Sequence, residues 1–134
     1  MIKRGEDPAA RSFMRYARYG FERAGLSGFA LYDSIRGVCA NGRDAARMLA
    51  VCDTLRLLRF LGRTDVEMAV RAIYFTHRGK SPRRNEITLR VRRFAAEHYV
   101  DDRTVYRHLA YAKRLFLQLV EAHGCPAEKI RKNF

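Results

Sequence analysis

Cysteine is scarce and widely spaced in this chain of 134 residues. Cys39, Cys52 and Cys125 are odd in number and form no Cys-x-x-Cys pair. Disulfide frameworks and structural zinc sites need paired or closely spaced cysteines, so neither is expected. His123 lies two residues before Cys125, but no second pair stands at ligand spacing. We therefore predict no metal site, and reduced, buried thiols of the kind found in cytoplasmic proteins.

Long apolar segments are also missing, because arginine interrupts nearly every hydrophobic stretch. No run approaches the apolar core of a secretory signal or the roughly 20 residues of a membrane-spanning helix. The sequence therefore predicts a cytoplasmic protein with no membrane partner.

Enzyme motifs are absent as well. The chain has no nucleophile–base motif, no phosphate-binding glycine loop and no dinucleotide fingerprint. Asp101 and Asp102 are adjacent carboxylates, but they open a predicted helix, where acidic residues cap the backbone and complement the helix dipole. We predict no enzyme activity, no catalytic residue and no cofactor.

Acidic residues are few: 14 Asp and Glu stand against 27 Lys and Arg, for a net charge of +13. Such a surface attracts a polyanion by electrostatic steering and counterion release. Of the basic residues, 22 are arginine, whose planar fork of donors matches phosphate oxygens and the guanine edge. An arginine-rich genome composition is the alternative explanation. Residues 78–93 concentrate the excess, with seven basic residues and one acidic residue.

Apolar residues recur at helical spacing, and no strand-period run is present, which predicts an all-α fold. Pro8 and Gly25 are typical of the first and last positions of a helix, and Thr64 with Glu67 forms a capping-box pattern. We expect two regions, 1–62 for packing or oligomerisation and 63–134 for DNA binding. The predicted helices of this bundle cover residues 8–24, 28–40, 43–61, 65–77, 86–98 and 102–122.

Two apolar stripes in the N-terminal region help to locate its predicted core. The segment 43–61 is the most apolar of the chain and should be the central helix. Its buried face is expected to include Met48, Leu55 and Leu58, and to end with Phe60 or Leu61. The weaker stripe of 28–40 consists of Phe29, Tyr32, Ile35 and Val38 or Cys39.

Residues 86–122 carry the most specific pattern. Ile87, Val91, Phe94 and Ala95 line one face of the first of two predicted helices. In the stretch Val-Asp-Asp-Arg-Thr-Val-Tyr-Arg-His-Leu at 100–109, an apolar residue closes the turn and a small polar residue caps the second helix. Val105 and Leu109 should attach that helix to the core. This arrangement resembles the entry to the recognition helix of a helix-turn-helix, whose N-terminal end enters the major groove.

The wider pattern over residues 65–122 resembles region four of bacterial sigma factors, and still more the ArpU and RinA type of phage late-gene transcriptional regulators. The resemblance implies sequence-specific binding to promoter-like duplex DNA in a phage or prophage, with RNA polymerase as a further partner. One position departs from it: the turn residue that is usually glycine is Tyr99. A left-handed backbone is strained for tyrosine, so the sequence predicts a longer or differently shaped turn.

The leading hypothesis is a DNA-binding transcriptional regulator. Candidate base contacts are Arg103, Thr104, Tyr106 and Arg107, which should face outward near the start of the second helix. Candidate phosphate contacts are Arg83, Arg84, Arg90, Arg93 and Lys113.

Two alternatives stay open. A phage packaging or assembly protein, such as a small terminase subunit, also carries a helix-turn-helix but acts as a homo-oligomer. An RNA-binding module could use some of the 7 Tyr and 8 Phe for base stacking.

Overall fold

The computed structural model describes residues 7–39, 41–75 and 85–124, and within these ranges it contains helices and no strand. The predicted all-α fold is therefore confirmed for the described residues. None of the described helices has the length and apolar character that crossing a membrane requires. The elements are α1 (Pro8–Tyr19), the short 3-10 helix η1 (Phe21–Ala24), α2 (Gly28–Val38), α3 (Gly42–Phe60), α4 (Thr64–Tyr74), α5 (Glu86–Glu97) and α6 (Asp102–Ala122).

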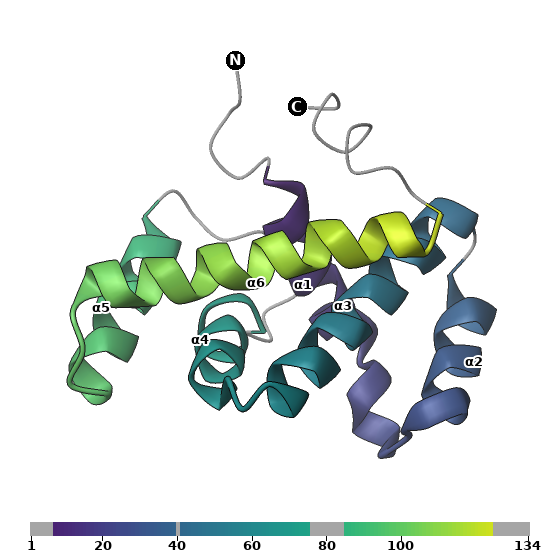
Figure 1. Ribbon diagram of the computed structural model, residues 1–134, viewed down its shortest axis with the longest axis horizontal. Coiled ribbons are helices and arrows are strands. Elements are labelled where there is room, and N and C mark those ends of the chain that lie inside the picture. The colour runs from purple at the N-terminus through teal and green to yellow at the C-terminus, as the bar shows by residue number, and fades with distance from the viewer. Residues whose placement is uncertain (1–6, 40, 76–84, 125–134) are drawn as a thin grey trace.

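The longest helix, α6, lies across α3 and α4, with α5 near one of its ends and α2 near the other (Figure 1). The helix α3, which the sequence predicts to be central, contacts α1, α2, α4 and α6, and α6 likewise contacts four helices, α1, α3, α4 and α5. Phe13 of α1 packs on Tyr74 of α4 and on Phe116 of α6, with ring centroids 5.8 and 5.6 Å apart. Residues from both predicted regions, 1–62 and 63–134, thus share one hydrophobic core.

The first helix is shorter than the predicted span 8–24. Pro8 occupies its first turn as expected, and the Asp7 carboxylate accepts hydrogen bonds from the backbone N–H groups of Ala9 and Ala10. The helix ends at Gly20, whose φ of 71° reverses the chain into η1. Gly25 caps η1 rather than α1. A left-handed glycine at position 20 ends the helix earlier than the apolar spacing indicated.

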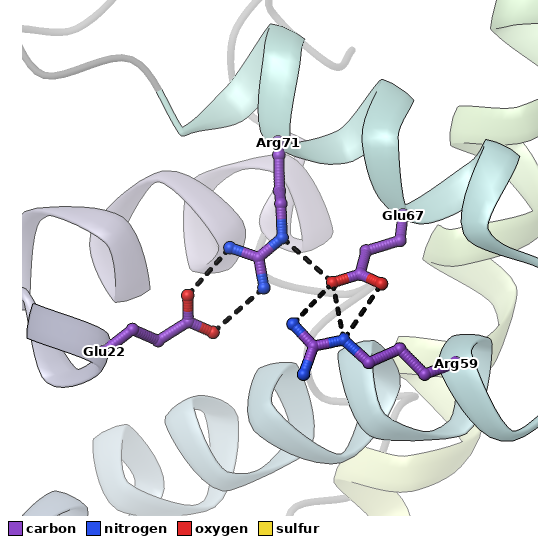
Figure 2. Close-up of polar contacts among 4 residues, drawn as sticks. All are labelled: Glu22, Arg59, Glu67 and Arg71. Carbon is purple, nitrogen blue, oxygen red and sulfur yellow. Dashed lines mark hydrogen bonds and ion pairs between the residues drawn. The ribbon is translucent and has the colours of Figure 1, made fainter. Parts of the chain in front are cut away.

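The predicted capping box at the start of α4 is wrong. Arg63 takes the N-cap position, and no side chain caps the helix there. Glu67 is 7% exposed, and it accepts hydrogen bonds from Arg59 at 2.9 and 3.1 Å and from Arg71 at 3.0 Å. Arg71 also donates two hydrogen bonds to Glu22 of η1 (Figure 2). Glu67 therefore binds two arginines instead of capping its helix. Together with the contact between Arg71 and Glu22, these hydrogen bonds link η1, α3 and α4.

The predicted stripe of α2 is correct in part. Ile35 is buried, and of the alternatives Val38 and Cys39 it is Cys39 that is buried, at 8% exposed. Phe29 is 87% exposed, and Leu31 is buried in its place. At the end of α3 both alternatives, Phe60 and Leu61, are exposed, at 86% and 47%. Because α2 packs chiefly against α3 and η1, it buries only a narrow stripe.

Candidate nucleic-acid interface

A short turn joins α5 to α6. The carbonyl of Ala95 accepts a hydrogen bond from the N–H of Val100 at 3.0 Å, which closes the end of α5. Asp101 caps α6, because its Oδ1 accepts the N–H of Thr104 at 2.7 Å. This backbone hydrogen bond is the main reason why the pKa of Asp101 lies below its usual value. The bounds of α6 match the predicted segment 102–122, and its predicted acidic cap is confirmed.

Tyr99 adopts the left-handed conformation inside this turn, with φ of 55°. Among the described residues it is the only one other than glycine with positive φ. The prediction of a longer turn is therefore wrong. Only residues 98–101 separate α5 from α6, and Tyr99 adopts the left-handed conformation within them. The strain in such a residue is about 1–2 kcal/mol. The side chain is 95% exposed, so no packing of its ring offsets the strain.

The two faces of α6 differ sharply. Val105 and Leu109 are 0% and 2% exposed, as predicted, and continue into a buried stripe with Ala112, Phe116 and Val120. Arg103, Tyr106 and Arg107 are exposed on the outer side of the helix. Thr104 is half-buried, and its backbone N–H donates a hydrogen bond to Asp101. Three of the four candidate base contacts thus have side chains that a ligand can reach.

Among the described candidate phosphate contacts, Arg90 and Lys113 are engaged within the chain. Arg83 and Arg84 lie outside the described residues, and Arg93 is exposed on α5. Arg90 donates to the carbonyl of Ile73 at 2.7 Å and to Glu86 at 2.9 Å, and its side chain is 15% exposed. This arginine fastens α5 to the end of α4.

Lys113 is likewise engaged within the chain. Its Nζ lies 2.5 Å from the Asp7 carboxylate and 5.6 Å from the ring centroid of Tyr74. This lysine joins α6 to the start of α1 and to α4. Among the described candidate phosphate contacts, Arg93 is therefore the one whose side chain is exposed.

Sequence reasoning missed Arg114, which is exposed on the same side of α6 as Arg103 and Arg107. Its position could have been read from the helical repeat, because it lies seven residues after Arg107. Tyr111 is half-buried beside it, with its ring centroid 6.0 Å from the guanidinium carbon of Arg114. On the same ring lies Arg63 of the α4 N-cap, at 4.9 Å.

A separate polar cluster lies at the far end of α6. His123 contacts Asp53 of α3, with Nε2 and Oδ2 2.7 Å apart, and the Tyr32 hydroxyl of α2 donates to the same carboxylate. Burial, together with this hydrogen bond, raises the pKa of Tyr32 to about 12. Within the described part of the chain, no three His, Cys, Asp or Glu side chains gather as metal ligands. The cluster attaches the end of α6 to α2 and α3.

The two described cysteines are free and buried, as predicted. Burial raises the pKa of Cys39 to about 11, which keeps this thiol protonated and unreactive at neutral pH. Cys125 lies outside the described residues.

Comparisons with known proteins identify no relative: no family model matches the chain, and neither a curated protein nor a solved structure matches it. The functional interpretation is therefore based on the outer face of α6 and the turn that precedes it.

Proposed function

We propose that this protein binds duplex DNA, with the first turns of α6 in the major groove. The observation that carries this proposal is the division of α6 into two faces. Val105 and Leu109 hold one face to the core, while Arg103 and Arg107 extend from the other. Within the described ranges no carboxylate lies in ion-pair contact with Arg103 or Arg107, so both guanidinium groups are available to an anionic partner.

The turn before α6 supports a helix-turn-helix as the form of this interface. In that motif the turn contains a left-handed residue, for which glycine is usual, and Tyr99 takes this conformation at the corresponding position. In this arrangement α5 is attached to α4 by Arg90 and packs against both α4 and α6, with Val91 and Ala95 buried. A backbone held at both ends of the turn presents α6 without a large ordering cost on binding.

The charge of the whole chain supports a polyanionic partner. A net charge of +13 accelerates association with DNA, and each basic residue that meets a phosphate releases counterions. The binding should therefore depend steeply on salt. We further propose, from the resemblance to sigma region four and to ArpU and RinA type regulators, that the bound sites are promoter-like and that the protein regulates transcription.

The test is a selection of bound duplexes from a random pool, followed by affinity measurements on the selected site. The variant that replaces both Arg103 and Arg107 by Ala should lose most of its preference for the selected site over a scrambled duplex. The matched control replaces Arg18 and Arg56, which are exposed on α1 and α3, and removes the same charge. If both double variants lose affinity equally, or if the wild type selects no sequence, the groove assignment is wrong.

A second candidate is a DNA-binding assembly protein that acts as a homo-oligomer. The specific observation in its favour is the exposure of two large aromatic side chains, Phe29 and Phe60, since exposed aromatic residues are enriched in protein interfaces. Sedimentation of the purified protein distinguishes the two candidates. The assembly protein would be favoured if the wild type sediments as a defined oligomer of high order. Replacing Phe29 and Phe60 by Ser should then make it monomeric.

A further inference from the structure

We infer that Arg114 is a phosphate contact of the same interface, held in place by the ring of Tyr111. This inference rests on the proposed function. It assigns to Arg114 the role that the sequence pattern gave to the neighbouring Lys113, whose amine is engaged by Asp7 and Tyr74.

Arg114 lies on the same side of α6 as Arg103 and Arg107. At about 100° per residue, Arg103, Arg107 and Arg114 fall within about 40° of one another on the helical projection. This sector is opposite the buried stripe that includes Val105 and Phe116. A duplex that contacts the outer face at Arg103 and Arg107 therefore faces Arg114 as well.

The distance along α6 from Arg103 also suits a phosphate contact at Arg114. Eleven residues separate Arg103 from Arg114, which is about 16 Å at 1.5 Å per residue. The major groove is about 12 Å wide. When the N-terminal end of α6 lies in the groove, Arg114 has therefore reached its edge, where phosphates are exposed and base edges are not. The planar fork of an arginine suits phosphate oxygens at that position.

Arg114 is restrained by a neighbouring ring, and its charge is still available to an anion. Its guanidinium carbon lies 6.0 Å from the ring centroid of Tyr111, within range of a cation–π interaction. Arg63 contacts the same ring but is paired with Asp65, at 3.1 and 3.4 Å. Among the described residues no carboxylate forms an ion pair with Arg114. The ring thus orders the side chain, and Arg63 supports the ring.

The structure offers a matched control in Arg36 of α2. Its guanidinium carbon lies 5.7 Å from the ring centroid of Tyr32, so Arg36→Ala removes the same charge and the same type of contact. Arg36 belongs to α2, whereas the proposed interface is formed by α5 and α6 (Figure 1).

The experiment measures dissociation constants of the full chain for the selected duplex and for a scrambled duplex over a series of salt concentrations. Arg114→Ala should weaken both by the same factor and reduce the slope of log affinity against log salt by about 0.9, the loss of one phosphate contact. Tyr111→Leu should weaken both duplexes less than Arg114→Ala does and leave the slope closer to the wild-type value. Arg36→Ala should leave the slope unchanged. Thermal unfolding establishes that all variants are folded.

Three results would overturn the inference. An unchanged slope for Arg114→Ala would show that this side chain meets no phosphate, and a loss in Arg36→Ala equal to that in Arg114→Ala would reduce the effect to net charge. Equal or tighter binding to an RNA duplex of the same sequence would exclude the groove geometry, because the deep major groove of RNA does not admit a helix. If only the Arg114 result fails while the Arg103 and Arg107 variant loses its preference, the proposed function stands without this contact.

Discussion

The arginines around Glu67 and those on the outer face of α6 have opposite surroundings. Arg59 and Arg71 both contact Glu67, and Arg71 continues to Glu22, so two positive and two negative side chains offset one another. Arg103 and Arg107 extend into solvent without an ion-pair partner among the described residues. The difference teaches that a large positive charge does not by itself locate an interface. The arginines to examine are those that the fold leaves without a carboxylate.

The cluster around Glu67 is also more buried than the outer face of α6. Burial raises the pKa of the Glu67 carboxyl, but hydrogen bonds and attraction from Arg59 and Arg71 together outweigh this effect, and its pKa lies below the usual 4.5. The charged form of Glu67 is thus stabilised by the folded state. Losing this cluster should affect folding, and losing the outer arginines should affect binding.

The largest expected effect comes from the side of α6 opposite its arginines. Val105→Asp places a charge at a position with no exposure, so the C-terminal helices should lose about 4 kcal/mol or more of stability. Thermal or denaturant unfolding measures the loss. Tyr106→Asp, at the next residue and 45% exposed, is the control and should change stability by about 0.5 kcal/mol or less. Equal unfolding temperatures for the two variants would mean that the register of α6 is wrong.

The next effect separates the two groups of arginines directly. Glu67→Gln should lower the free energy of unfolding by about 2 kcal/mol, a value reduced by the 59% exposure of the Arg59 side chain. DNA affinity, measured where the variant is fully folded, should not change. A variant of normal stability would mean that the contacts of Arg59 and Arg71 with Glu67 contribute nothing to folding.

For the arginines of α6 the expected effects are reversed: DNA affinity should change, and stability should not. Arg107→Ala should cost about 1–3 kcal/mol on the selected site and relax specificity at one base pair, while the unfolding temperature stays the same. Arg93→Ala, at the exposed candidate phosphate contact on α5, should weaken selected and scrambled duplexes alike. Equal proportional losses for Arg107→Ala on both duplexes would make Arg107 a backbone contact and rotate the proposed groove geometry.

Of the two groups of arginines, acid should affect the one around Glu67. Because the pKa of Glu67 is lowered in the folded state, its contribution to stability is complete above the unfolded value near 4.5 and is lost as the pH falls through the folded pKa. The stability difference between wild type and Glu67→Gln should therefore be constant near neutral pH and shrink below about pH 4.5. Denaturant titrations at several pH values measure it. A difference that grows on acidification would contradict the lowered pKa.

The smallest effect concerns the turn. Tyr99→Gly removes the left-handed strain of about 1–2 kcal/mol and adds back about 0.5–1 kcal/mol of chain entropy, for a net stabilisation of about 1 kcal/mol. His98→Gly, at a neighbour with φ of −107°, should instead destabilise the protein. If both glycines act alike, the backbone at Tyr99 is not left-handed in solution.

Local patterns predicted the elements well where a cap and a helical repeat coincide. The acidic Asp101 and the spacing of Val105, Leu109 and Phe116 are both local, and α6 has the expected bounds. The stripe of α2 was predicted correctly at Ile35 but not at Phe29, because its few apolar residues fit two alternative stripes, and only contact with the rest of the fold selects Leu31.

The candidate interface was predicted in part, for a related reason. Exposure of Arg103 and Arg107 follows from the helical repeat, which is a property of one segment. The engagement of Lys113 by Asp7 and of Arg90 by the Ile73 carbonyl depends on residues distant in the chain. Such contacts leave no trace in local spacing, so sequence alone assigned both side chains to phosphate.

Because the two faces of α6 differ, substitutions on them should be tolerated differently during evolution. Substitutions at positions 103, 107 and 114 alter no buried contact, whereas Val105, Leu109 and Phe116 tolerate little change in volume. Descendants of one ancestral chain can therefore acquire different binding preferences while their cores stay the same. Relatives of this protein should be recognised by the buried stripe of α6 and its acidic cap, and their targets should differ with the outward positions 103 and 107.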